Sequence, residues 1–88
     1  MHIVYVLEHS EIQQSYVGYT TDLKRRVREH NARGHKYTTR RAGKWILIYA
    51  EAYRDESDAR ERERKLKIHG SAMQSLLKRL TKSRLSQK

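Results

Sequence analysis

Apolar residues recur along the chain in two patterns, and one of them predicts three β-strands. Residues 3–7 are an almost unbroken run of β-branched and aromatic side chains, typical of a strand covered on both faces. Residues 15–19 resume this composition after a polar link whose length suits an antiparallel return, so the two strands should pair as a hairpin. Residues 45–53 alternate between two apolar sets, which predicts a third strand with both faces at least partly covered.

The other pattern is helical, and it first occurs between the second and third strands. Leu23 and Val27 recur at helical spacing behind residues 20–22, whose side-chain oxygens can cap the free N–H groups of a helix. Residues 31–34 contain Asn and Gly, and they are expected to end this helix. Residues 31–44 are then expected to form a polar, basic surface loop.

Two further helices are predicted after the third strand. Residues 55–68 form the first of them, with Asp55 or Ser57 as its cap. Ser71 and Gln74 make a capping box for the second, whose apolar residues lie on one stripe. The resulting order of elements, β-β-α-β-α-α, is that of an α+β protein.

The length and the charge of the chain limit its organisation and its partners. With 88 residues there is room for one domain, which we place at residues 1–81, followed by a basic, flexible tail at residues 82–88. The 20 Lys and Arg exceed the 10 Asp and Glu, and a net charge of +10 favours a polyanionic partner. A membrane-lying helix would need a broad Trp, Phe and Leu face, yet the chain has one Trp and no Phe. Nucleic acid is therefore favoured over a membrane, and a ribosome-associated or merely soluble basic protein is the alternative.

Composition also excludes several kinds of site. The chain has no Cys, which excludes disulfides, thiolate zinc sites and thiol nucleophiles. The apolar run at residues 2–7 is too short for a membrane span and lacks the features of a secretory signal. A cytoplasmic location is therefore expected.

One carboxylate lies where apolar residues are expected. Glu63 shares a stripe of its helix with Ala59 and Leu66, because successive helical residues rotate by about 100°. An inward carboxylate costs several kcal/mol unless a cation or donors accompany it, so Glu63 requires a bound metal or an arginine. Glu61 lies on the opposite side and is expected to be a solvated charge with local ion-pair partners.

Four further side chains could contribute chemistry. Arg26 and His30 lie at the margin of the buried stripe of the first helix, where an Arg offers a fixed fork of donors to a phosphate and a His can relay a proton. Tyr5 and Tyr16 lie on the two strands that should pair. Each of the four also has a structural explanation, which is core packing for the tyrosines and a surface or helix-edge position for the other two.

These residues belong to a longer ordered set, which comprises Ile3-Val4-Tyr5, Tyr16-Val17-Gly18, Arg26, His30 and Glu63. The set resembles the GIY-YIG endonuclease family, in its small stand-alone bacterial form with a URI-type domain, and the resemblance spans nearly the whole chain. It implies a small three-stranded antiparallel sheet flanked by helices, in agreement with the predicted order of elements. It also implies hydrolysis of nucleic-acid phosphodiester bonds.

The resemblance implies a role for each matching residue. Tyr5 and Tyr16 would lie near the attacking water, with Tyr5 favoured as the base. Arg26 would bind the scissile phosphate, and His30 would assist in the proton or phosphate network. Glu63 would be the single protein carboxylate on one divalent ion, Mg²⁺ or Mn²⁺, because Mg²⁺ keeps most of its waters. Further nucleic-acid contacts are expected from seven basic side chains: Lys24, Arg25, Arg33, Lys36, Arg40, Arg41 and Lys44.

Departures from the family pattern shape the expected function. Ile3 replaces the first Gly, where strand backbone alone is needed, and Tyr19 replaces the Lys of excision-repair relatives. No target-recognition domain follows, which predicts structure-directed or low sequence specificity. We therefore expect a metal-dependent endonuclease of repair or recombination, with DNA favoured over RNA, acting as a monomer or as a dimer on its substrate. A non-cleaving nucleic-acid-binding module of the same fold is the main alternative, and a structural protein of a ribonucleoprotein particle is a weaker one.

Overall fold

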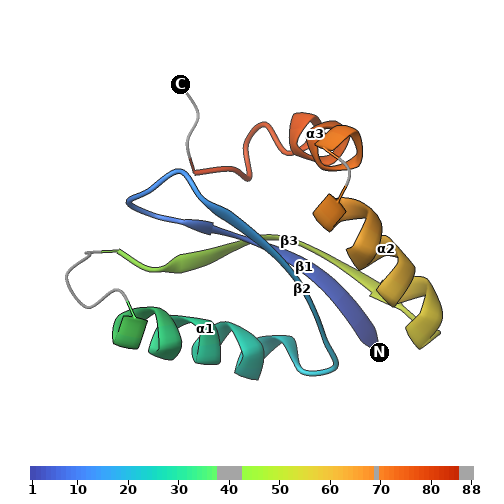
Figure 1. The fold of residues 1–88 in the computed structure, drawn as a ribbon, viewed down its shortest axis with the longest axis horizontal. Helices are drawn as coiled ribbons and strands as arrows, with labels where there is room; N and C mark the ends of the chain where they lie inside the picture. Colours follow the sequence, from blue (N-terminus) through green and yellow to red (C-terminus); the bar gives the residue numbers. More distant parts are fainter. Residues whose placement is uncertain (38–42, 69, 86–88) are drawn as a thin grey trace.

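The computed structural model describes residues 1–37, 43–68 and 70–85, with the backbone alone for residues 33–37 (Figure 1). Its elements follow the predicted order: β1 His2–His9, β2 Ser15–Thr20, α1 Leu23–Tyr37, β3 Trp45–Tyr53, α2 Glu56–Ile68 and α3 Gly70–Arg79. The predicted α+β class, with a three-stranded antiparallel sheet flanked by helices, is confirmed. Among the described residues, no helix is long and apolar enough to cross a membrane.

The sheet has the strand order β2-β1-β3, and both pairings are antiparallel. The strand β1 lies in the centre because it is the most continuously apolar of the three, and it is buried from Val4 to His9. The pairing of β1 with β3 shifts between Val6 and Leu7, so that Ile48 has no partner in β1.

Helices cover both faces of the sheet. The helix α1 lies on one face, and α3 lies on the other with α2 beside it (Figure 1). The core lies in the α2 and α3 layer and consists of Val4, Val6, Val17, Ile48, Ala59, Leu66 and Leu76. Because strand side chains alternate between faces, Tyr5 points away from this core and toward α1, where its hydroxyl meets His30.

A carboxylate with little exposure joins β3 to α2. Glu51 accepts hydrogen bonds from the Tyr49 hydroxyl at 2.6 Å and from the Tyr53 hydroxyl at 2.5 Å. Arg62 Nε donates to the same carboxylate at 3.1 Å. Burial pushes the pKa of Glu51 up, but the three donors push it down further, so the pKa lies below its usual value. Burial and the bond to Glu51 raise the pKa of Tyr53 to about 12.

The starts of two helices are capped as the sequence predicts. The Asp22 carboxylate accepts a hydrogen bond from Arg25 N at 3.2 Å, at the start of α1. The Asp55 carboxylate accepts one from Ser57 N at 2.8 Å, at the start of α2. Of the two caps considered for that helix, Asp55 is therefore the one used.

The predicted end of the first helix is wrong. The helix α1 continues through Gly34 to Tyr37, because a single Gly costs a helix only about 1 kcal/mol. Asn31 lies within the helix and does not end it. Its side-chain Nδ2 donates to Trp45 O at 3.2 Å and its Oδ1 accepts from Trp45 N at 2.8 Å, so this side chain ties α1 to β3. The capping-box prediction placed the start of the third helix too late, because α3 begins at Gly70.

The C-terminal residues turn back onto the sheet. Arg84 Nε donates to Glu8 Oε2 at 2.8 Å, and Leu85 N donates to Glu8 Oε1 at 2.8 Å. The Glu8 side chain is 5% exposed, so these contacts close over a buried carboxylate of β1. The division into a domain at residues 1–81 and a tail at residues 82–88 stays a prediction.

Candidate active site

Tyr5 and Tyr16 lie on the face of the sheet that α1 covers. They come from β1 and β2, and their ring centroids are 6.2 Å apart. Gly18 pairs with Tyr5 across the two strands. A Cβ atom at position 18 would lie 2.5 Å from Tyr5 Cζ and 2.9 Å from Tyr16 Cε2. Glycine therefore leaves room for both rings over the backbone of β2.

His30 of α1 packs over the two tyrosines. Its Nε2 lies 3.0 Å from the Tyr5 hydroxyl, and its ring centroid is 4.3 Å from that of Tyr16, edge to face. Tyr5 has no exposed surface, so the Tyr5–His30 bond is shielded from water on the Tyr5 side. Its direction depends on which imidazole nitrogen carries the proton.

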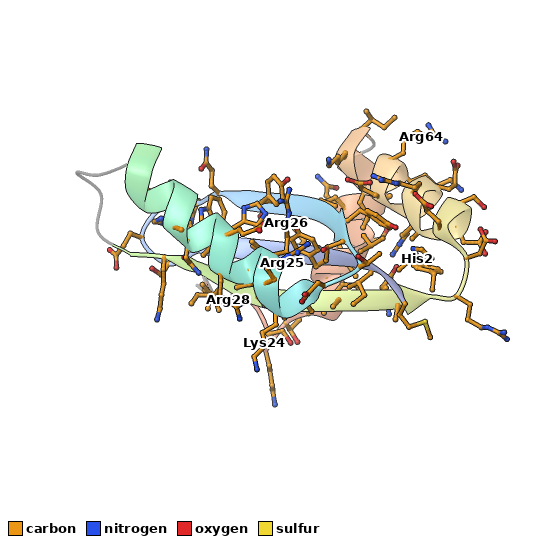
Figure 2. The ribbon with its side chains drawn as sticks, turned by 90° about the horizontal axis from the view of Figure 1, so that it is seen from below. His2, Lys24, Arg25, Arg26, Arg28 and Arg64 are labelled. Atoms are coloured by element: carbon orange, nitrogen blue, oxygen red, sulfur yellow. The ribbon has the colours of Figure 1, made fainter. Side chains whose placement is uncertain are left out.

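Arg26 precedes His30 by one turn of α1 and faces the same site. Figure 2 shows Arg26 on the opposite side of α1 from Lys24 and Arg28. Arg26 Nη1 donates to Glu29 Oε1 at 3.1 Å. Arg26 Nε is buried and has no hydrogen-bond acceptor of good geometry among the described residues. A buried donor without an acceptor costs about 1–3 kcal/mol, which a ligand oxygen at this position would remove.

Two pKa shifts describe the electrostatics of the site. Burial raises the pKa of Tyr5, and contact with the Arg26 guanidinium counteracts part of that rise. The neighbouring Tyr16 and Glu63 charges raise the pKa of Tyr5 further. The pKa of Arg26 is also raised, first by the Tyr5 hydroxyl and then by Glu29. The free protein therefore holds Tyr5 as a neutral phenol beside a permanent cation.

A cavity of about 170 Å³ opens beside these residues, and its lining consists of Tyr16, Arg26, Glu29 and His30. This volume is several times the roughly 15 Å³ that one water molecule needs. Three of the four lining residues are site residues that the sequence predicted. An anionic group in this cavity would meet the Arg26 guanidinium in competition with the Glu29 carboxylate.

Glu63 reaches the same region from α2. Its side chain is 14% exposed, with Lys67 Nζ at 2.9 Å from Oε2 and Arg60 Nη1 at 3.7 Å from Oε1. Lys67 Nζ lies 6.0 Å from the Tyr16 ring centroid, and the charge of Glu63 raises the pKa of Tyr5. The sequence predicted a metal or an arginine as the partner of Glu63, and the structure shows the arginine together with a lysine.

The seven basic residues predicted to contact nucleic acid are only partly described. Lys24 and Arg25 are exposed on α1, and Lys44 is exposed immediately before β3. Arg25 Nε lies 3.7 Å from Glu29 Oε2, next to the cavity. Four of the seven lie outside the described side chains: Arg33, Lys36, Arg40 and Arg41. The first two of these lie on α1 and not in a loop, because the helix extends to Tyr37.

The sequence analysis missed two contacts of the site. Glu29 lies one helical turn after Arg26, and Lys67 lies one helical turn after Glu63. Helical spacing places such pairs on one face, so this signal could have identified both. The same spacing did identify Glu61 as a solvated charge, which is confirmed by its 50% exposure and its ion pairs along α2.

The described side chains limit which metal ion Glu63 could hold. Within the described ranges, no group of three or more His, Cys, Asp or Glu side chains could hold an ion. A single carboxylate suits a hard, hydrated cation such as Mg²⁺, which keeps several waters and takes one or two carboxylates plus phosphate oxygens. Ions that need several nitrogen or sulfur ligands do not fit these residues.

Comparison with known families defines the class of protein. Residues 1–82 match the family described as the GIY-YIG catalytic domain. The chain therefore belongs to the GIY-YIG family, as the resemblance of its ordered motifs indicated. Membership in this family implies a nuclease-like function and a nucleic-acid substrate.

Several relatives are similar over most of the chain. A UPF0213 protein of Haloquadratum walsbyi is 46% identical over 77% of this chain and 75% of its own length. A UPF0213 protein of Halobacterium salinarum is 44% identical over 88% of this chain and 99% of its own length. A UPF0213 protein of Staphylococcus haemolyticus is 40% identical over 75% of this chain and 79% of its own length. These names specify no reaction. No solved structure matches the chain significantly.

Proposed function

We propose that this protein is a metal-dependent endonuclease that hydrolyses phosphodiester bonds, in DNA rather than RNA, with structure-directed or low sequence specificity. The observation that carries this proposal is the buried Arg26 Nε, which has no acceptor of good geometry among the described residues and belongs to a side chain that lines the cavity with Tyr16 and His30. A phosphate oxygen supplies that acceptor in a charge-assisted hydrogen bond.

Arg26 binds the scissile phosphate. Its guanidinium exchanges the Glu29 carboxylate, now 3.1 Å from Nη1, for phosphate oxygens. A phosphodiester is anionic and repels an incoming hydroxide, so a fixed positive charge at its oxygens lowers the barrier to attack. Glu63 would hold a divalent ion, which would supply further positive charge at the same phosphate.

Tyr5 and His30 handle the proton of the attacking water. Tyr5 is a neutral phenol in the free protein because burial raises its pKa, so it cannot act as a base while it keeps its proton. Because Tyr5 has no exposed surface, the attacking water meets His30, which lines the cavity and takes its proton, while the Tyr5 hydroxyl, 3.0 Å from His30 Nε2, holds the imidazole in place. Tyr16 contacts His30 in an edge-to-face arrangement and fixes the orientation of the imidazole.

A second candidate function has one observation in its favour. Glu63 already has two cationic partners, Arg60 and Lys67, so its charge is balanced without a metal ion. A nucleic-acid-binding module of the same fold that does not cleave would keep such a balanced carboxylate. Both functions predict affinity that falls with salt, because both use basic side chains on phosphates.

Cleavage assays separate the two functions. Labelled linear and branched substrates, of the kind met in repair or recombination, are incubated with Mg²⁺ or Mn²⁺ and wild type, Arg26→Ala, Glu63→Gln or Arg28→Ala. Arg28 is the matched control, because it is an exposed arginine on the opposite side of α1 (Figure 2). We expect wild type and Arg28→Ala to cut at similar rates, and EDTA to stop both.

Arg26→Ala and Glu63→Gln should cut at least about a hundredfold more slowly, since each removes charge stabilisation from the transition state. Both should still bind nucleic acid at low salt. Binding without cutting by wild type on every substrate would favour the non-cleaving module. Equal cutting rates of all four proteins would refute the assignment of the active site to Arg26 and Glu63.

A further inference from the structure

Two cations pair with the two oxygens of Glu63, and one of them also lies near a residue that lines the cavity. Lys67 Nζ is 2.9 Å from Oε2 and Arg60 Nη1 is 3.7 Å from Oε1. Lys67 Nζ is also 6.0 Å from the centroid of the Tyr16 ring, and Tyr16 lines the cavity. The ammonium group of Lys67 is therefore within one side-chain length of both.

The two cations are held differently. The Arg60 guanidinium lies 3.9 Å from the centroid of the Tyr19 ring and 3.5 Å from Glu56 Oε2, so three groups fix it. Among the described residues, Lys67 has Glu63 as its one ion-pair partner. An ammonium on a flexible four-carbon stem changes partners more easily than a stacked guanidinium. Lys67 is therefore the exchangeable cation of the pair.

We propose that Lys67 is a positioning residue that exchanges between Glu63 and the bound phosphate. In the free protein its ammonium occupies the cation position at Glu63 Oε2. A divalent ion on Glu63 displaces the ammonium by like-charge repulsion, and Lys67 then contacts a phosphate of the nucleic acid beside Tyr16. The inference rests on the proposed function, because it uses the metal and the phosphate that the proposal places there.

The exchange couples the two ligands. Nucleic acid that draws Lys67 away leaves Glu63 open to the ion, and the ion that displaces Lys67 provides a cation for the nucleic acid. By linkage, each ligand then raises the affinity of the site for the other by the same factor. Lys67 thereby keeps Glu63 paired until both ligands are present.

Metal binding without nucleic acid gives the first test. Electron paramagnetic resonance of free Mn²⁺ measures the affinity of wild type, Lys67→Met and Lys65→Met. Lys65 is the matched control, because it lies on the same helix at 55% exposure and pairs with Glu61 on the outer face. Lys67→Met should bind Mn²⁺ about three- to tenfold more tightly, since a competing ion pair is removed. Lys65→Met should stay within about twofold of wild type, because salt screens its more distant charge.

Nucleic-acid binding in EDTA gives the second test, free of metal and of cleavage. Glu63→Gln leaves Lys67 without its carboxylate, so this variant should bind a labelled duplex about three- to tenfold more tightly than wild type. In the Lys67→Met background, Glu63→Gln should change the affinity by less than about twofold. Such a double-mutant cycle isolates the contribution of Lys67 from the general effect of removing a negative charge.

The outcomes separate this inference from the proposed function. Equal Mn²⁺ affinity of Lys67→Met and wild type, or no Mn²⁺ binding by either, overturns the exchange. A Glu63→Gln gain that is the same with and without Lys67 also overturns it, even if wild type cuts DNA. If both tests give the expected changes but wild type cuts no substrate, the exchange stands and the endonuclease proposal fails.

Discussion

Replacing Gly18 by alanine tests whether the two tyrosine rings need the bare backbone of β2. The added Cβ would lie 2.5 Å from Tyr5 Cζ and 2.9 Å from Tyr16 Cε2, whereas carbon atoms in contact are about 3.5–4.0 Å apart. The Tyr5 ring must therefore move by about 1 Å. Gly43 is the glycine with a positive φ among the described residues, so alanine at position 18 meets no backbone strain. Any loss in this variant comes from the displaced rings.

Overpacking of this kind costs about 1–3 kcal/mol in the free energy of unfolding. A displacement of about 1 Å at a reacting group also costs up to about a hundredfold in rate. Urea unfolding followed by circular dichroism measures the first effect, and single-turnover cleavage measures the second. Gly70→Ala is the matched control, because nothing lies within 4 Å of the Cβ it would add. The reasoning is refuted if Gly18→Ala matches wild type in both stability and rate.

Two further predictions concern the scaffold. Asn31→Ala should lower the free energy of unfolding by about 1–3 kcal/mol, because the backbone N–H and C=O of Trp45 both lose their side-chain partner. Urea unfolding measures this free energy, and no change would mean that the Asn31 side chain does not tie α1 to β3. Glu51→Gln should destabilise the protein most at neutral pH. The folded-state pKa of Glu51 lies below its unfolded value of about 4.3, so its contribution is full above that pH and is lost as pH falls through the folded pKa. Urea midpoints of both proteins from pH 7 to pH 3 should therefore converge, and a constant difference would contradict the linkage.

Local patterns predicted the elements that depend on neighbouring residues. The strand at residues 45–53 has the predicted bounds, and the caps of Asp22 and Asp55 are present, because alternation and capping are properties of a few adjacent residues. The prediction that α1 ends at residues 31–34 relied on Gly34 and was wrong. The local preference of Gly to end a helix is weak, at about 1 kcal/mol, so it did not decide where α1 ends.

The candidate site shows the same division between local and distant information. Helical spacing placed Arg26 and His30 at the edge of the buried stripe and Glu63 inside it, and the exposures agree with both statements. The convergence of Tyr5, Tyr16 and His30 could not follow from spacing, because it depends on the pairing of β1 with β2 and on how α1 crosses the sheet. The ordered motif supplied that convergence through family resemblance, not through physical derivation.

The most direct test of the account is single-turnover cleavage of a labelled branched duplex in Mn²⁺ by wild type, Arg26→Ala and Arg28→Ala. Arg26 Nε has no acceptor of good geometry among the described residues, and Arg26 lines the cavity. We therefore expect Arg26→Ala to cut at least about a hundredfold more slowly, while Arg28→Ala keeps the wild-type rate. Equal rates for the two arginine variants, whether both fast or both slow, would contradict the assignment of the phosphate to Arg26.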